Sequence, residues 1–311
     1  MASVVRFSPD LSAWLGQSLS EGQTPAKLVQ IMIDERMDPR VARAIVDAFV
    51  LAHRSGLPLP LDSLTIEDEP PEYVYGEPRL PRHARFETSD RIVPVLSRVE
   101  RPVVVVLGDV FSPEECAELI ELARPRLVPS TIVNPYSGQD EVAAQRTSLG
   151  MFFRLEETPL IAKLDRRVAE LMQLPLENGE GFQVLHYPAG AEAAPHFDFL
   201  APSNDANRAS LARSGQRVST LITYLNEVES GGATTFPKAG LTVLPVRGNA
   251  VYFEYCDQSS QLDHRSLHAG APVQRGEKWV ATKWMRQRRF VSAAQDEARS
   301  SKISSPARPD S

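Results

Sequence analysis

Residues 195–199 read Pro-His-Phe-Asp-Phe, a stretch that predicts two side chains of a metal site. Successive side chains of an extended strand point to opposite faces, so His196 and Asp198 are expected to project the same way. An imidazole and a carboxylate side by side, with a further imidazole supplied by the fold, provide two nitrogen ligands and one oxygen ligand. Such a set caps one face of an octahedral iron(II) and leaves the opposite positions open for a cosubstrate and dioxygen.

A second stretch supplies the further imidazole. Residues 266–270 read Ser-Leu-His-Ala-Gly, with His268 at the centre, and residues 276–279 read Gly-Glu-Lys-Trp. A His-x-Asp pair alone is weak evidence, because it arises often by chance. His268 and the lysine that follows it at position 278 make the prediction of a metal site much stronger.

Lys278 opens a predicted strand that ends at Met285. Strand alternation places it on one face with Val280, Thr282 and Trp284. A lysine on such an apolar face is expected to look into a barrel, where its charge requires an anionic partner.

Downstream of Phe182 the apolar pattern is typical of strands. Short runs of β-branched and aromatic residues alternate with glycine and proline turns. Many short strands with regular turns favour a β-sandwich or a jelly roll. The predicted strands are residues 183–187, 196–200, 217–225, 233–236, 241–244, 249–255 and 278–285.

The region upstream of these strands carries helix signals. Residues 103–107 are a continuous apolar run typical of a buried strand, and residues 112–115 form a capping box that predicts a helix after it. Thr158-Pro159 predicts the start of another helix. Residues 131–145 are expected to be a long loop, and residues 201–215 a surface insertion beside the metal strand.

The chain divides by composition into four segments. Residues 1–56 are expected to form a small helical unit, because Thr24-Pro25 and Asp38-Pro39 are typical helix starts. This unit fits a packing or dimerisation appendage, or a substrate-docking module. Residues 57–97, rich in proline and acidic residues, predict an extended linker. The main domain is expected to cover residues 98–291, and residues 292–311 to be a disordered tail.

The overall composition limits the classes of partner. The 311 residues are 42% hydrophobic and 24% charged, with a net charge of −6, so nucleic-acid binding is not favoured. Arg286 and its neighbours Arg288 and Arg289 are expected to form a solvated strand end. Cys116 and Cys256 fit no metal spacing. No signal peptide or membrane-spanning stretch is recognised, so a soluble, cytoplasmic protein without a membrane partner is expected. Homo-oligomerisation remains open.

Several motifs, in the same order, resemble the prolyl 4-hydroxylase family. The resemblance covers about residues 100–288, and leaves the first hundred residues unexplained. The motifs are Arg-Thr-Ser-Leu-Gly-Met-Phe at 146–152, His-Tyr-Pro-Ala-Gly at 186–190, Pro-His-Phe-Asp at 195–198, Tyr-Leu-Asn-Glu-Val-Glu-Ser-Gly-Gly-Ala-Thr-Thr-Phe-Pro at 224–237, and His-Ala-Gly-Ala-Pro-Val at 268–273 with Gly-Glu-Lys-Trp at 276–279.

The resemblance implies an α+β fold with a double-stranded β-helix (jelly-roll) core, supporting helices and the small N-terminal helical unit. It implies that residues 98–291 are a 2-oxoglutarate- and Fe(II)-dependent dioxygenase domain. By this resemblance His196, Asp198 and His268 ligate iron, and Lys278 holds the distal carboxylate of 2-oxoglutarate. Tyr187 and Thr220 are weaker candidates for lining the cosubstrate pocket. Ascorbate is implied as a reductant that rescues oxidised iron.

The resemblance also implies a set of peptide-contacting residues, namely Arg146, Ser148, Glu180, Arg217 and Trp284. This sequence departs from the family pattern at two positions on the substrate side. Ala193 stands where the family usually has a tyrosine, and Arg286 where a histidine is often found. A prolyl substrate is therefore less firmly implied than the metal chemistry.

Three functions are compatible with the sequence. The first is hydroxylation of prolyl residues in a peptide or protein, with release of succinate and CO2. The second keeps the same cofactors and acts on a free amino acid or another small metabolite. The third is a catalytically silent binding module of the same fold, which the complete set of predicted ligands and Lys278 disfavours.

Overall fold

The computed structural model describes residues 3–55, 59–66, 73–130, 132–133, 140–141, 148–293 and 295–296. The chain forms two compact units, residues 1–72 and residues 73–311. In its described residues, the first unit contains three helices and a two-stranded sheet. The second contains the predicted main domain and all the candidate site residues that the structure describes.

The helices of the first unit begin where the N-cap signals indicate. Helix α2 (Pro25–Asp34) is capped by the Thr24 side chain, and α3 (Pro39–Ser55) follows Asp38, whose carboxylate accepts two backbone N–H groups. Helix α1 (Pro9–Ser20), which the sequence analysis did not predict, is capped by Ser8. Strand β1 (Ser3–Arg6) pairs antiparallel with β2 (Ser63–Ile66), so part of the predicted linker is a strand of this unit.

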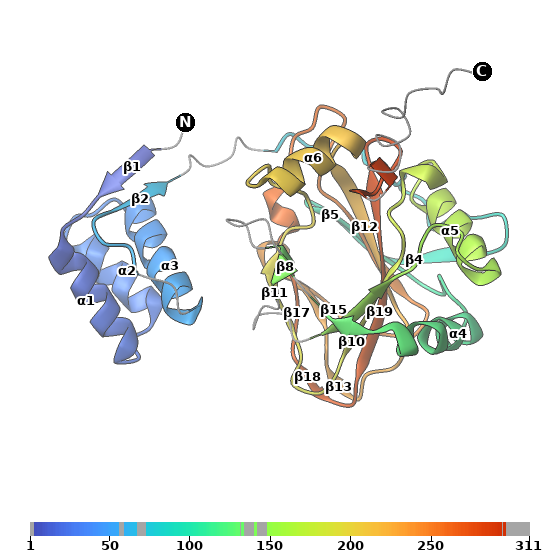
Figure 1. Ribbon diagram of the computed structural model, residues 1–311, viewed down its shortest axis with the longest axis horizontal. Helices are drawn as coiled ribbons and strands as arrows, with labels where there is room; N and C mark the ends of the chain where they lie inside the picture. Colours follow the sequence, from blue (N-terminus) through green and yellow to red (C-terminus); the bar gives the residue numbers. More distant parts are fainter. Residues whose placement is uncertain are drawn as a thin grey trace, which may run out of the picture. The chain divides into compact units, whose positions relative to one another are not determined.

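The second unit is built around two facing antiparallel sheets, a jelly-roll core. The large sheet has nine strands in the order β3-β4-β5-β16-β12-β19-β10-β9-β6, and the smaller one has four in the order β11-β17-β14-β15. Figure 1 shows the smaller sheet opposite β12 and β19 of the large one. The strands of the large sheet are β3 (Arg85–Glu87), β4 (Ile92–Glu100), β5 (Val103–Leu107), β6 (Val128–Pro129), β9 (Leu149–Phe152), β10 (Gln183–Tyr187), β12 (Arg217–Tyr224), β16 (Ala250–Glu254) and β19 (Lys278–Arg286). Those of the smaller sheet are β11 (Ala193–His196), β14 (Thr234–Phe236), β15 (Leu241–Val243) and β17 (His268–Gly270).

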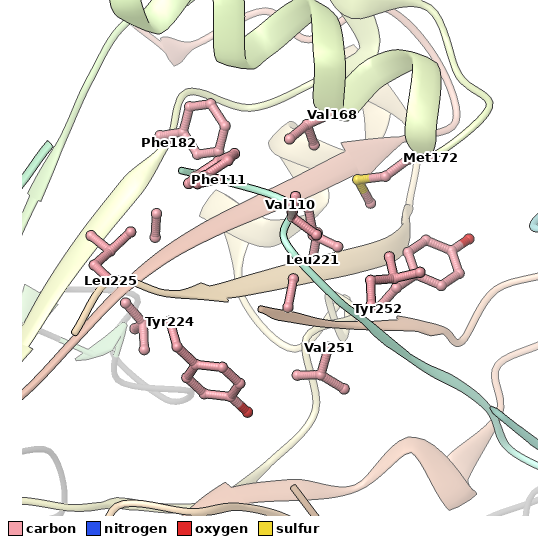
Figure 2. Packing of buried hydrophobic residues seen from close by; sticks show 14 of the residues in the cluster. Val110, Phe111, Val168, Met172, Phe182, Leu221, Tyr224, Leu225, Val251 and Tyr252 are labelled. Carbon is pink, nitrogen blue, oxygen red and sulfur yellow. The ribbon is translucent and has the colours of Figure 1, made fainter. Parts of the chain in front are cut away.

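Two helices cover the face of the large sheet that lies away from the smaller sheet (Figure 1). Helix α4 (Pro113–Ala123) has the predicted capping box between Ser112 and Glu115, and α5 (Pro159–Leu171) is capped by Thr158. Val168 and Met172 point from this helical layer toward Leu221 of the sheet (Figure 2). The helices therefore cover the outer face of the large sheet, and its inner face, toward the smaller sheet, holds the site.

The structure departs from the sequence expectations in three segments of the second unit. The predicted linker contributes β3 and β4 to the large sheet. The predicted surface insertion contains a helix, α6 (Asp205–Ser214), capped by Asn204. The strand predicted at 196–200 instead ends at His196, after a register shift in its pairing with β17.

Other elements are short or lie partly outside the described residues. The predicted loop at 131–145 contains a small ladder of β7 (Ile132–Val133) and β8 (Asp140–Glu141), and its other residues lie outside the described part. Strands β13 (Ser230–Gly231) and β18 (Val273–Arg275) also pair with each other. Gly56, expected to close α3, and the tail beyond residue 296 are outside the described residues. Within the described residues, no helix has both the length and the apolar character needed to cross a membrane.

Candidate metal centre

The smaller sheet brings the three predicted metal ligands together. His196 is the last residue of β11 and lies opposite His268, the first residue of β17, in the strand pairing. Asp198 follows two residues after His196, in a bend rather than in the strand. One ligand atom from each of the three side chains lies within 4.8 Å of the other two.

Backbone carbonyls orient both imidazole rings. His196 Nδ1 lies 2.8 Å from the carbonyl oxygen of Ala194, and His268 Nδ1 lies 3.1 Å from that of Ser266. A carbonyl only accepts, so in a neutral ring each Nδ1 carries the proton and each Nε2 keeps its lone pair. The two Nε2 atoms each lie 3.7 Å from a different oxygen of Asp198.

The charge states of the buried residues Asp198 and His268 leave no proton between the carboxylate and the imidazole Nε2. Burial between Phe236 and Phe253 lowers the pKa of His268 to about 4, although Asp198 opposes the shift. Burial alone would raise the pKa of Asp198, but attraction by His268, His196 and Arg217 outweighs it and lowers the pKa. Near neutral pH, a carboxylate and a neutral imidazole therefore face each other with lone pairs. Two nitrogens and one oxygen converging in this way fit a divalent cation, and the set is the one that non-haem Fe(II) oxygenases use.

Lys278 places a buried positive charge in the same cavity. Its side chain is 4% exposed, and its ammonium forms no ion pair or hydrogen bond with the residues that the structure describes. Burial lowers its pKa to about 8, and the Tyr187 and Tyr224 rings lie 5.5 and 5.7 Å from the ammonium. A buried ammonium without an acidic neighbour fits an anionic ligand such as a carboxylate of 2-oxoglutarate.

The cavity between the sheets has a volume of about 50 Å³ and joins the three ligands to Lys278. The sequence prediction for β19 is confirmed here, because all four side chains predicted to share its inner face line the cavity. Tyr187 also lines it, as expected. Thr220, predicted beside the cosubstrate, is fully buried and donates a hydrogen bond to Asp198 Oδ2 at 2.7 Å instead.

An ion-paired cluster lies next to the metal ligands. Arg217 donates to both Glu180 oxygens, at 2.7 and 2.8 Å, and its guanidinium carbon lies 4.1 Å from the centre of the Trp284 ring. Burial alone would raise the pKa of Glu180, but attraction by Arg217 and Arg286 lowers it. Arg217 also donates to the backbone carbonyl of Asp198 at 3.3 Å. Three predicted substrate residues are thus brought together, and they also help to hold the backbone of Asp198, a predicted metal ligand.

The remaining predicted substrate residues behave differently. The Ser148 hydroxyl is buried and donates to Ser130 at 3.0 Å, while Arg146 lies outside the described residues. The prediction of a solvated Arg286 was wrong. Arg286 is 1% exposed and donates to Glu180 at 2.9 Å and to the carbonyl of Gly215, just after α6, at 2.7 Å.

Two features of the site were not found from the sequence. The Tyr255 hydroxyl lies 3.0 Å from Thr220 Oγ1, which itself donates to the predicted metal ligand Asp198. The other feature is the α6 contact, through which Arg286 also reaches the Ser210 carbonyl at 3.0 Å. Both join residues far apart in the chain, and no local sequence signal indicates either contact.

The facing sheets and the His-Asp-His set beside Lys278 are those of an Fe(II)- and 2-oxoglutarate-dependent oxygenase. In agreement, residues 182–286 match the model of the 2OG-Fe(II) oxygenase superfamily. "Prolyl 4-hydroxylase 1" of Arabidopsis thaliana is 42% identical over 202 residues, which are 60% of this chain and 70% of the relative. "Probable prolyl 4-hydroxylase 3" of the same plant is 37% identical over 203 residues, 59% of this chain and 69% of the relative.

The chain belongs to the prolyl 4-hydroxylase family, and it is a 2-oxoglutarate- and Fe(II)-dependent dioxygenase. Among solved structures, the viral collagen prolyl hydroxylase of Paramecium Bursaria Chlorella virus-1 is 28% identical. It aligns with a TM-score of 0.47 over 59% of this chain and 95% of the viral one.

Proposed function

We propose that this enzyme hydroxylates prolyl residues of a peptide or protein, converting 2-oxoglutarate and dioxygen to succinate and CO2. The observation that supports this proposal is one cavity that holds both the His196–Asp198–His268 set and Lys278, whose ammonium has no ion-pair partner in the described part of the chain. The relatives named above are prolyl 4-hydroxylases, and the Glu180–Arg217–Trp284 cluster beside the ligands supports a related substrate.

In this mechanism His196, Asp198 and His268 hold iron(II), and Lys278 pairs with the distal carboxylate of 2-oxoglutarate. When bound, iron and 2-oxoglutarate supply the oxidising chemistry, in which one atom of dioxygen enters succinate and the other the substrate. The chain supplies orientation. The Ala194 and Ser266 carbonyls fix the imidazole rings, and Leu185, Ile222 and Val280 give the cavity apolar walls.

We assign substrate binding to the wall of the cavity beside the predicted metal ligands, where Trp284 lines the cavity. Trp284, backed by Arg217, offers an aromatic face on which a prolyl ring can pack, and Glu180 holds the guanidinium in that position. Ascorbate is proposed as the reductant that maintains iron(II). A cytoplasmic location is also proposed, supported by Cys116 and Cys256, which are both buried free thiols.

A second candidate is oxidation of a free amino acid or small metabolite with the same cofactors. The observation that favours it is Ala193, which lines the cavity where family members usually carry a tyrosine. A small side chain at this position leaves more room in the cavity for a small ligand than a tyrosine would.

The experiment that tests the proposal measures succinate formed under air with Fe(II), 2-oxoglutarate and ascorbate. A proline-rich peptide is compared with the same peptide carrying alanine at every proline, and with free amino acids, while mass spectrometry follows each substrate. We expect succinate to rise only with the proline peptide, together with one added oxygen on a prolyl residue. Stimulation by a free amino acid alone would support the second candidate, and no succinate with metal present would contradict both.

A further inference from the structure

The carboxylate of Asp198 is held from behind by a chain of two hydroxyl groups. Thr220 Oγ1, on the central strand β12, lies 2.7 Å from Asp198 Oδ2, and the Tyr255 hydroxyl lies 3.0 Å from the same Thr220 oxygen. All three side chains are buried, and Tyr255 follows directly after β16, the neighbour of β12 in the sheet.

Proton accounting fixes the direction of this chain. An ionised carboxylate only accepts hydrogen bonds, so the Thr220 hydroxyl must donate its single hydrogen to Asp198. The contact between Thr220 and Tyr255 then requires the phenol to donate. Burial, first of all, raises the pKa of Tyr255 well above its usual value, so the phenol keeps the proton it donates.

The backbone around the two hydroxyl residues holds them rigidly. Tyr255 donates its N–H to the Val218 carbonyl at 3.1 Å and accepts from the Asp263 N–H at 2.8 Å. Its ring packs 5.8 Å from that of Phe253, which in turn contacts His268. The chain of hydroxyls therefore belongs to the large sheet, whereas the histidine ligands belong to the smaller sheet.

We propose that Thr220 and Tyr255 are positioning residues, which act as a relay from Tyr255 to Thr220 to Asp198 and lock the carboxylate in its metal-binding orientation. This inference rests on the proposed role of Asp198 as a metal ligand. With Oδ2 engaged by Thr220, the rotation of the carboxylate is fixed, and Oδ1 stays 3.7 Å from His196 Nε2. The relay thereby ties the ligands on the smaller sheet to the framework of the large sheet.

The test measures binding of Co(II), a spectroscopic stand-in for Fe(II), to the full-length protein stripped of metal, by calorimetry and visible absorption. Losing an outer partner of a ligand typically weakens metal affinity about 10- to 100-fold, so we expect that range for Thr220→Val, with a changed Co(II) spectrum. Thr220→Ser restores the donor and is expected to stay within about threefold of the wild type. Tyr255→Phe is expected to weaken binding by about three- to tenfold.

Thr223→Val is the matched control. Thr223 lies on the same strand and is buried, but its hydroxyl has no hydrogen-bond partner among the described residues. The Co(II) affinity of Thr223→Val is therefore expected to match that of the wild type. The Tyr255→Phe effect should vanish in the Thr220→Val background, because Tyr255 acts through Thr220. Melting temperatures of the metal-free variants verify that each one is folded.

Two outcomes would overturn the relay and are distinct from failure of the proposed function. Folded Thr220→Val protein that binds Co(II) within about twofold of the wild type would show that Thr220 does not position Asp198. Fully additive losses in the double variant would show that Tyr255 does not act through Thr220. Absence of Co(II) binding by the wild type itself would remove the metal assignment and the relay with it.

Discussion

The buried ammonium of Lys278 makes 2-oxoglutarate binding depend on pH in a way that can be worked out. Burial lowers its pKa to about 8 in the free protein, and pairing with a carboxylate favours the charged form and raises it again. Only the protonated lysine attracts the anion. Above pH 8 the lysine of the free protein is mostly neutral, so it must take up a proton when 2-oxoglutarate binds. The apparent Kd then scales as 1 plus ten to the power (pH − 8), which predicts a loss of affinity of about tenfold between pH 7 and pH 9.

The assay is equilibrium dialysis of labelled 2-oxoglutarate with anaerobic protein loaded with Mn(II), at fixed ionic strength. His268, with a pKa of about 4, and Asp198, with a lowered pKa, do not titrate in this window. Lys278→Met should bind 2-oxoglutarate much more weakly and lose the pH dependence between 7 and 9. An equally steep loss in Lys278→Met, or a flat profile in the wild type, would refute the assignment of this lysine.

Three further predictions concern the surroundings of the site. Arg286→Met removes one partner of the buried Glu180 and the contacts to α6, and should lower the free energy of unfolding by about 3 kcal/mol in urea titrations. An unchanged urea midpoint would show that these contacts do not stabilise the fold. Lys283→Met leaves Asp165 buried without its partner at 2.6 Å and should cost about 3–5 kcal/mol by the same measurement, whereas Lys283→Met with Asp165→Leu should recover most of this loss. Ala193→Tyr adds bulk to the cavity wall and should raise the KM of a free amino acid substrate more than that of a peptide. Equal changes in the two KM values would show that Ala193 does not select substrate size.

Local signals were sufficient where neighbouring residues determine the conformation. Thr158 caps the helix that begins at Pro159, and the capping box at Ser112 forms as predicted. Alternation from Lys278 to Trp284 correctly placed four side chains on the cavity, because a regular strand shows opposite faces in turn. These signals require no knowledge of distant contacts.

The sequence predicted correctly that His196 and Asp198 project to the same place, but it assumed that both lie in one extended strand. The two side chains converge on one point, but the strand stops at His196 and a bend carries Asp198 inward. The register shift that β11 makes against β17 arises from pairing with a strand about seventy residues downstream. A motif therefore predicted the chemistry, while the backbone conformation depended on the partner strand.

Long-range contacts determine the surroundings of two residues whose positions the sequence did not indicate, Thr220 and Arg286. Thr220 does lie on the inner face, two positions before Ile222 of the cavity wall, but Asp198 covers its hydroxyl. Arg286 looked like part of a solvated cluster of arginines, yet Glu180 and the end of α6 surround it. Neither burial can be inferred from neighbouring residues, because both depend on how separate segments meet in the folded chain.

The central claim is that His196, Asp198 and His268 support iron- and 2-oxoglutarate-dependent hydroxylation of a prolyl residue. The most direct measurement incubates the wild type and His196→Ala with a proline-rich peptide under labelled 18O2, and follows both products by mass spectrometry. We predict one labelled oxygen in a prolyl residue and one in succinate for the wild type, and neither for folded His196→Ala. Unlabelled hydroxyproline in the wild type, or unchanged labelling in His196→Ala, would contradict the account.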